Sequence, residues 1–459
     1  MNINIKNKKK IYGWARHDYS KSYYNEIDLI DDFDNFFETV NKNKLTVSLR
    51  ANGRSYGDNT LNSDNIILKH KNFNKIINFN KDVGTIEVQS GITLEEIIIH
   101  TVPFGWILNV CPAHRYITVA GAISNNVHGK NCFKKGYFGD YIEEFTFYSY
   151  SKGKLTCSRK QNHKYFYSII SGIGILGLIL NVKINLRKIQ SYNLTNNIKR
   201  IKNIEEMILQ MNNLKKSSEY NIGSIDATKF SDDNLSGSLF SSNFIDDNSL
   251  EINNHKPNNI ILLINYIYVL GKYFPFSNSL LNKAISIHTR GGLNPKDITQ
   301  VISYSQMNFL NDIYAPKYNY YFKNGFVEYQ VIFPEHLALN AFIDLKKILK
   351  SNNTYSLMSS FKAYKSVDEP YIFGLSKNGY CISFDIPYEK HLNMETLVRK
   401  LNETTIKYNG QVYLAKTPSL NSDEFREMYK NFDKFITIKT ELDPENIFQS
   451  DLSKRLDLI

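Results

Sequence analysis

The fold is decided by Leu49-Arg50-Ala51-Asn52-Gly53-Arg54-Ser55-Tyr56-Gly57-Asp58-Asn59, a stretch that follows a strand-like run at residues 45–48. Its glycines, together with Asn, Ser and Asp, predict a tight turn, because these residues suit the backbone conformations that turns require. Successive N–H groups in such a turn converge and can bind an anion such as a phosphate. Arg50 and Arg54 add positive charge. Taken alone, the stretch is equally compatible with an ordinary surface loop.

A second glycine- and alanine-rich run covers residues 112–131 and reads P-A-H-R-Y-I-T-V-A-G-A-I-S-N-N-V-H-G-K-N. Small side chains let a flat or extended ligand lie directly against the backbone. His128 and Lys130 stand where the apolar part of the run ends. A single histidine is usually structural, but the glycine-rich surroundings of this one favour a ligand site.

A third segment contains Gly172, Gly174 and Gly177, which match the G-x-G-x-x-G spacing of dinucleotide-binding folds. The context does not fit that motif, because residues 178–184 are predicted to form a strand where the motif requires a helix. We therefore interpret the segment as a core turn unless the other two runs bring it to a ligand. Together, three glycine-rich segments within about 130 residues indicate one large, extended, phosphate-bearing cofactor.

The surrounding pattern mixes strands with short helices. Residues 85–90 alternate as a half-buried strand does, and Thr93 and Glu96 have the spacing of a capping box, with Pro103-Phe104-Gly105 ending the helix. Residues 217–258, rich in Ser, Asn and Asp, are predicted as loops. Further strands are predicted at residues 259–268, 325–333 and 380–386, and helices at 336–351, 394–408 and 422–432.

Length and composition limit the class of protein. A chain of 459 residues is expected to form two domains or one large one, since a domain usually has roughly 100–200 residues. The net charge, 56 − 45 = +11, fits simple solubility or an anionic cofactor, substrate or membrane surface. Nucleic-acid binding would leave the glycine-rich runs unexplained.

The first twelve residues lack the apolar core of a signal peptide, and no apolar stretch reaches the length of a spanning helix.

Four scattered cysteines form no CxxC pair, which argues against a disulfide framework or a zinc site. We expect a protein of a reducing compartment, cytoplasmic, with peripheral contact at the inner membrane.

These motifs resemble those of the vanillyl-alcohol oxidase / p-cresol methylhydroxylase flavoprotein superfamily, and within it the decaprenylphosphoryl-β-D-ribose 2′-oxidases, the oxidase half of an epimerase. The resemblance covers nearly the whole chain. It rests on Arg54–Asn59, Pro103–Gly105, Thr118–Gly121, His128–Asn131, Gly136–Gly139, Tyr329-Gln330, Tyr413–Lys416 and Asp443–Leu456.

The resemblance implies an α+β fold with two domains. Residues 1–190 would form a PCMH-type FAD-binding domain, residues 191–405 a substrate domain built on an antiparallel sheet, and residues 406–459 a C-terminal segment that returns to the FAD-binding domain.

The same resemblance implies the site. FAD would contact Leu49, Arg50, Ala51, Asn52, Gly53, Arg54, Ser55, Tyr56, Gly57, Asp58, Asn59, Ala113, Thr118, Val119, Ala120, Gly121, Asn125, Asn126, Val127, His128, Leu178 and Tyr413. The substrate would contact His128, Lys130, Gln330, Lys362 and Lys416. Lys416 and Tyr56 would be catalytic, and no metal is expected.

The implied reaction oxidises a secondary hydroxyl of a sugar carried on polyprenyl phosphate, or otherwise phosphorylated, and a short-chain reductase partner completes the epimerisation. The alternative is an aldonolactone or alditol oxidase that uses oxygen. Lys416 would act as the base or as an electrostatic stabiliser of the alkoxide. A further alternative is that Lys416 and Lys362 only grip a substrate phosphate.

Three departures from the family pattern limit what can be transferred. Ser383 stands where the family has a cysteine, with Cys381 two positions earlier; Glu328 replaces one glutamine of a Gln-Tyr-Gln run; and residues 217–258 match poorly. Residues 53–56 contain no histidine to bond covalently to the flavin, so we expect non-covalent FAD. A thioether from Cys132 is the remaining covalent alternative.

Overall fold

The structure is a computed structural model of the whole chain. It describes residues 3–27, 33–70, 72–228, 231, 234–252, 283, 286, 297–310, 312, 318–320, 322–366, 369–375, 377–416 and 419–459. The strand predicted at residues 259–268 lies outside these ranges.

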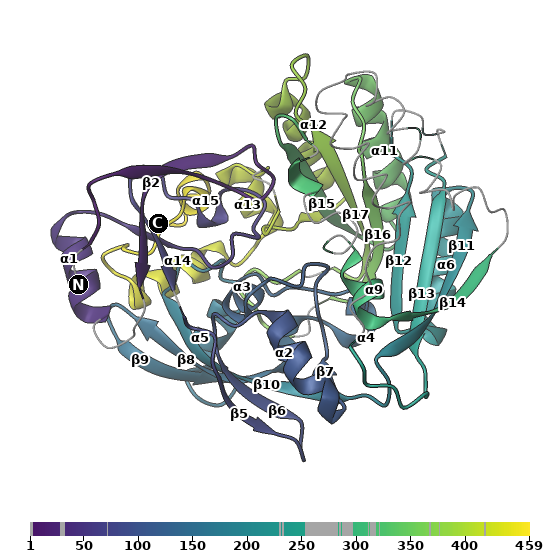
Figure 1. Cartoon of the computed structure of the whole chain (residues 1–459). Coiled ribbons are helices and arrows are strands. Elements are labelled where there is room, and N and C mark those ends of the chain that lie inside the picture. The colour runs from purple at the N-terminus through teal and green to yellow at the C-terminus, as the bar shows by residue number, and fades with distance from the viewer. Residues whose placement is uncertain are drawn as a thin grey trace.

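The described residues form three β-sheets (Figure 1). The first has the order β1 (Lys8–Tyr12), β2 (Tyr19–Ile27), β4 (Ile66–His70), β3 (Val47–Leu49). The second has the order β5 (Ile76–Asn80), β6 (Thr85–Gln89), β10 (Leu178–Lys188), β8 (Ile142–Ser149), β9 (Gly153–Ser158), with β7 (Trp106–Leu108) paired to β10. The third is antiparallel, with the order β14 (Ile298–Ser303), β11 (Asn193–Ile201), β13 (Gly237–Phe244), β12 (Tyr220–Ile225), β16 (Ser359–Tyr364), β17 (Gly379–Pro387), β15 (Phe326–Pro334), β18 (Gln411–Val412).

Helices cover these sheets and connect them. The α-helices are α1 (Phe33–Lys42), α2 (Leu94–Thr101), α3 (Val119–Ser124), α4 (Cys132–Lys135), α5 (His163–Ile169), α6 (Ile204–Ser217), α9 (Tyr304–Asn308), α11 (Ala338–Ser351), α12 (Met394–Lys407), α13 (Ser422–Met428), α14 (Phe432–Leu442) and α15 (Asp451–Arg455). Short 3-10 helices are η1 (Asp58–Thr60), η2 (Val102–Phe104), η3 (Phe138–Tyr141) and η4 (Tyr318–Tyr320). None of the helices in the described ranges is long and apolar enough to cross a lipid bilayer.

The sheets confirm the α+β class, and each sheet takes its strands from a separate part of the chain. Strands of the first two sheets lie within residues 8–188, and those of the third lie within residues 193–412. This arrangement supports the proposed division near residue 190. Strand β18 still belongs to the third sheet, although it falls in the segment proposed to return to the FAD-binding domain.

Several local predictions are confirmed. Residues 85–89 form β6, and Thr93 and Glu96 form the capping box that begins α2. Gly105 ends η2 in the left-handed conformation, with φ +78. Strands β15 and β17 and helices α11 and α12 lie within two residues of their predicted bounds.

The loop prediction for residues 217–258 is wrong over β12 and β13. Two of the serines that made this segment resemble a loop, Ser224 and Ser242, line a cavity. Pairing with β11 and β16 supplies the neighbours that make β12 and β13 strands. The helix predicted at residues 422–432 also ends early, at Met428, and α14 follows as a separate helix.

The two faces of the third sheet have different partners. Phe333 and Phe361 point to the face covered by α11, where both pack edge-on against Phe342. Because successive side chains in a strand alternate between faces, Glu328, Gln330 and Lys362 occupy the opposite face. That face is therefore free to form a site.

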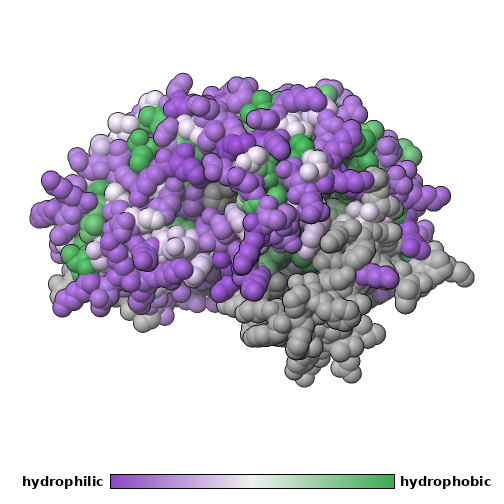
Figure 2. Space-filling view, turned by 90° about the horizontal axis from the view of Figure 1, so that it is seen from above, coloured by the Kyte–Doolittle hydropathy of each residue, from purple (hydrophilic) through white to green (hydrophobic). Residues whose placement is uncertain are grey.

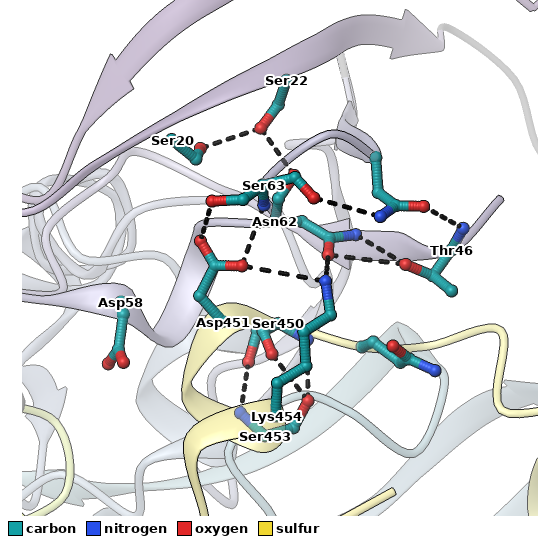
Figure 3. Close-up of polar contacts among 12 residues, drawn as sticks. Ser20, Ser22, Thr46, Asp58, Asn62, Ser63, Ser450, Asp451, Ser453 and Lys454 are labelled. Atoms are coloured by element: carbon teal, nitrogen blue, oxygen red, sulfur yellow. Dashed lines mark hydrogen bonds and ion pairs between the residues drawn. The ribbon is translucent and has the colours of Figure 1, made fainter.

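The C-terminal segment returns to the first sheet, where α14 and α15 lie beside the N-terminal strands in Figure 1. The Val47 N–H donates to the carbonyl of Ile447 at 2.7 Å. Figure 3 shows Asp451 accepting two hydrogen bonds from Ser63, each 2.8 Å, and Lys454 donating to Asn62. These contacts fix the chain immediately after the turn at residues 49–59.

Candidate active site

A cavity of about 760 Å³ lies between the glycine-rich loops and the open face of the third sheet. Most of the predicted residues line it: Leu49, Arg50, Ala51, Asn52, Gly53, Arg54, Ser55, Tyr56, Asn59, Ala113, Thr118, Ala120, Gly121, Asn125, Val127, His128, Lys130, Leu178, Gln330, Lys362, Tyr413 and Lys416. The structure thus brings together residues that are more than 360 positions apart in the sequence.

Four predicted cofactor residues, Gly57, Asp58, Val119 and Asn126, are not among the lining residues and support the wall instead. The Asp58 carboxylate binds the Arg455 guanidinium at 2.8 Å, which ties the first loop to the C-terminal helix. The Asn126 side-chain oxygen accepts from the Gly139 N–H at 2.9 Å. Sequence alone could not separate these supporting residues from the neighbours that face the cavity.

The first loop has the features of an anion-binding nest. Within the described part of the chain, the N–H groups of residues 51–55 meet no hydrogen-bond acceptor, and Gly53 has φ +60. Such unpaired, convergent N–H groups suit a pyrophosphate. Arg50 lines the cavity, and its guanidinium also lies against the loop and donates to Thr60 and to the Tyr12 carbonyl. Arg54, whose guanidinium is 5.2 Å from the Tyr116 ring, is the arginine better placed for a ligand.

The second run continues the cavity wall. The Thr118 side chain accepts from the Gly121 N–H and begins α3. A side chain at Gly121 would meet no atom within 3.4 Å, so the backbone there is open to a ligand. The side-chain oxygen of Asn125 is buried at the cavity without a hydrogen-bond partner. An extended cofactor that carries hydrogen-bond donors would satisfy this oxygen.

The third glycine segment also reaches the cavity, through Ile173, Gly174 and Gly177. The other two runs line the same cavity, which is the arrangement in which we expected this segment to face a ligand. The strand prediction after it is confirmed, because β10 begins at Leu178. The cavity's size, the nest and the unpaired Asn125 oxygen together fit FAD.

His128 lies at the centre of a polar cluster at the cavity. Its ring is within 2.9 Å of the Tyr364 hydroxyl and within 3.1 Å of the Gln330 amide nitrogen. Burial, followed by the charges of Lys362 and Lys416, holds the pKa of His128 well below its usual range. The imidazole is therefore neutral and serves as a hydrogen-bonding group.

Two predicted substrate lysines differ in their surroundings. Lys130 donates to the backbone carbonyls of Met307 and Asn308, which anchors α9 at the cavity. Burial and the nearby charge of Lys362 lower the pKa of Lys130 to about 7. The Lys362 ammonium forms no hydrogen bond or ion pair with any of the described residues, and burial lowers its pKa. Lys362 is thus the cation best able to bind an anionic ligand.

Lys416 is held by Glu328 and Tyr56. Its ammonium lies 2.8 Å from a Glu328 oxygen and 4.0 Å from the centroid of the Tyr56 ring. Both contacts stabilise a charged ammonium. Burial, together with the Glu328 carboxylate, holds the pKa of Tyr56 well above its usual range, so Tyr56 remains a phenol.

Several cavity residues were missed by the sequence-based prediction. His114 contacts the Tyr56 hydroxyl at 3.4 Å and the Asp312 carboxylate at 3.1 Å. His114 stands in the second glycine-rich run, so its place near a ligand could have been recognised from the sequence. No sequence pattern marked Asp312. Asp385 also lines the cavity, as do serines on β12, β13, β16 and β17: Ser224, Ser242, Ser359, Ser360 and Ser383. No cluster of three metal-binding side chains occurs within the described ranges.

Comparison with known proteins agrees with this site. A sequence model of the FAD binding domain matches residues 27–158, and a model of D-arabinono-1,4-lactone oxidase matches residues 366–456. Decaprenylphosphoryl-beta-D-ribose oxidase of Mycolicibacterium smegmatis is 24% identical over 426 residues, 90% of this chain and 89% of the relative. Cytokinin dehydrogenases 1 and 2 of Arabidopsis thaliana are 24% and 26% identical, over 31% and 32% of this chain and 25% and 29% of theirs.

The match to the FAD binding domain spans the nest and the second glycine-rich run. The match to D-arabinono-1,4-lactone oxidase includes Lys416 and the returning C-terminal helices. The sequence matches and the cavity geometry therefore indicate the same cofactor and the same type of protein. The chain belongs to the FAD-linked oxidoreductases of the vanillyl-alcohol oxidase / p-cresol methylhydroxylase type.

Proposed function

We propose that this chain oxidises a secondary hydroxyl of a sugar carried on polyprenyl phosphate to a ketone, as the oxidase half of a two-step epimerisation. The observation that carries the proposal is the Lys416–Glu328–Tyr56 cluster, which lies beside the unpaired Lys362 in the cavity that also contains the nest. The similarity to the mycobacterial ribose oxidase over 90% of the chain supports it.

In the proposed reaction, Lys416 and Glu328 have different roles. Bound FAD would accept the hydrogen and electron pair that leave the carbon. The Lys416 ammonium donates a hydrogen bond to the reacting oxygen and stabilises the negative charge that develops there. The Glu328 carboxylate, 2.8 Å from that ammonium, accepts the hydroxyl proton. The ion pair favours the stabilising role of Lys416 over the role of free base.

The phosphate end of such a substrate needs a separate cation. Lys362 supplies one, since its ammonium has no partner among the described residues, whereas Lys130 already binds two carbonyls.

FAD is proposed to bind without a covalent bond. Cys132 is fully buried and is not a lining residue, and burial raises the pKa of its thiol to about 12, so its thiolate is scarce at neutral pH.

The second candidate function is oxidation of an aldonolactone or alditol. Two observations favour it: the match to D-arabinono-1,4-lactone oxidase over residues 366–456, and Glu328 in place of a glutamine. An anionic carboxylate at that position disfavours a phosphate close to the reacting carbon, although Lys362 on β16 remains available for one farther away.

Turnover assays distinguish the two functions. The purified FAD-loaded protein is mixed anaerobically with decaprenylphosphoryl-β-D-ribose or with D-arabinono-1,4-lactone, and bleaching of the flavin is followed. We expect reduction by the lipid-linked sugar and little by the free lactone. Reduction by the lactone alone would replace the proposed function with the second candidate.

Two partners follow from the proposal. The ketone must be reduced by a short-chain reductase to complete the epimerisation.

The lipid-linked substrate also requires contact with a membrane, and we propose that this contact is electrostatic. On the face seen in Figure 2, hydrophobic residues form only small separate groups, whereas β1 exposes Lys8, Lys9 and Lys10. Such clustered lysines suit anionic lipid.

A further inference from the structure

Glu328 and Asp385 form a carboxyl pair at the cavity. They lie directly opposite one another in the register of β15 and β17, at a position where cross-strand side chains are about 4.5–5.5 Å apart at Cβ. Each residue is only 8% exposed, and both line the cavity. Two buried carboxyl groups so close together cannot both be ionised without a large electrostatic cost.

Among the described residues, Glu328 forms an ion pair and Asp385 forms none. Lys416 forms an ion pair with Glu328, and Lys362 on β16 is the other ammonium near the pair. The other titratable neighbours in the described ranges include three phenols: Tyr56 and Tyr413 near Glu328, and Tyr318, whose hydroxyl donates to Asp385 at 2.9 Å. Burial and the Glu328 carboxylate hold the pKa of Asp385 well above its usual range. The ion pair with Lys416 places the negative charge of the pair on Glu328, so Asp385 is the member that holds a proton.

We propose that this pair is the specificity element of the site: protonated Asp385 donates a hydrogen bond to a second hydroxyl of the substrate while Glu328 faces the reacting one. The site would then select a vicinal diol, with the two hydroxyls on neighbouring carbons. This inference rests on the proposed function for the reacting hydroxyl, but it predicts a protonation state that exists without substrate.

The protonation state can be measured directly. Infrared difference spectra of the FAD-loaded protein should contain the C=O stretch of a buried carboxylic acid at pH values above about 7, the value to which burial raises the pKa of Asp18. The band should disappear in Asp385→Asn. It should also disappear in Glu328→Gln, because Asp385 would then ionise against Lys416. Asp344→Asn is the matched control, since this carboxylate at the surface forms ion pairs with Lys347 and Lys407 and should leave the band unchanged.

Ligand preference is the second measurement. The probes are methyl β-D-ribofuranoside and its 3-deoxy analogue, and their binding to the FAD-loaded protein is measured anaerobically by calorimetry. A hydrogen bond to one such buried group is worth about 1–2 kcal/mol, so we expect roughly 5–30-fold tighter binding of the diol. The preference should fade as rising pH removes the Asp385 proton. It should persist at high pH in Asp385→Asn, which still donates, and vanish in Asp385→Leu.

Failure of this inference differs from failure of the proposed function. If no lipid-linked sugar is oxidised but the band and the diol preference are present, the carboxyl pair stands and the reaction is another one. A wild-type spectrum without the band, equal binding of the two sugars, or no binding of either would overturn the inference.

Discussion

Replacement of Lys416 by methionine tests the centre of the proposed mechanism. Methionine keeps much of the length and volume of the side chain but removes the charge that lies 2.8 Å from Glu328 and 4.0 Å from the Tyr56 ring. The nest at residues 51–55 is not altered. We therefore expect Lys416→Met to retain FAD while losing flavin reduction.

The size of the loss follows from the role of the ammonium. Removing one preorganised group that stabilises a developing oxyanion typically costs about 10²–10³ in rate. The same change leaves the buried Glu328 without its cation, which we expect to lower stability by about 1–3 kcal/mol. The double variant Lys416→Met/Glu328→Gln removes that unpaired charge. It should recover stability without recovering the rate.

Anaerobic stopped-flow bleaching of the flavin measures the rate, and thermal unfolding measures stability. Lys407→Met is the matched control, because Lys407 is an exposed lysine paired with Asp344 far from the cavity lining. Near-normal flavin reduction in Lys416→Met would refute the mechanism. So would a loss of rate fully recovered in the double variant, because the effect would then be one of stability.

The remaining predictions concern the cofactor, the membrane and the C-terminal segment. Acid precipitation should release free flavin into the supernatant, whereas a yellow pellet with a flavin-labelled peptide containing Cys132 would show the covalent alternative. Co-sedimentation with anionic liposomes should be salt-sensitive and weaker when Lys8, Lys9 and Lys10 are changed to glutamine; equal sedimentation with neutral liposomes would count against an electrostatic contact. Lys439→Met should cost about 3–5 kcal/mol in the free energy of unfolding, because Lys439 and Asp443 form a fully buried pair; exposed Lys434 on the same helix is the control, and equal losses would exclude the pair as the cause.

Local sequence patterns predicted much of the fold. The capping box at Thr93 and the strands at residues 85–89 and 326–334 were recognisable because their signals lie within a few residues of one another. The strands at residues 220–225 and 237–244 were not, because their stability depends on pairing with distant strands while one face remains polar. A loop-like composition can therefore also mark the wall of a cavity.

The candidate site shows the same division between local and long-range information. The nest and the second glycine-rich run could be predicted because each is one continuous segment. The contacts that decide the role of Lys416 could not be, since Glu328 and Tyr56 come from separate parts of the chain. The bonds that Arg50 donates to Thr60 and to the Tyr12 carbonyl could not be predicted either, because these partners lie 10 and 38 positions away in the sequence.

In the third sheet, side chains that pack in the core and side chains that line the cavity alternate along each strand. On β15 and β17, Tyr329 and Phe384 point into the helix-covered core, while Gln330 and Ser383 on the alternate positions line the cavity. A change at a cavity position leaves the packed face intact, because successive side chains point to opposite faces. The two departures from the family pattern on these strands, Glu328 and Ser383, both occur at cavity positions. We therefore expect this sheet to tolerate substitutions that alter substrate choice at little cost in stability, and Glu328→Gln to test this directly: it should unfold within a few degrees of wild type while its ligand preference changes.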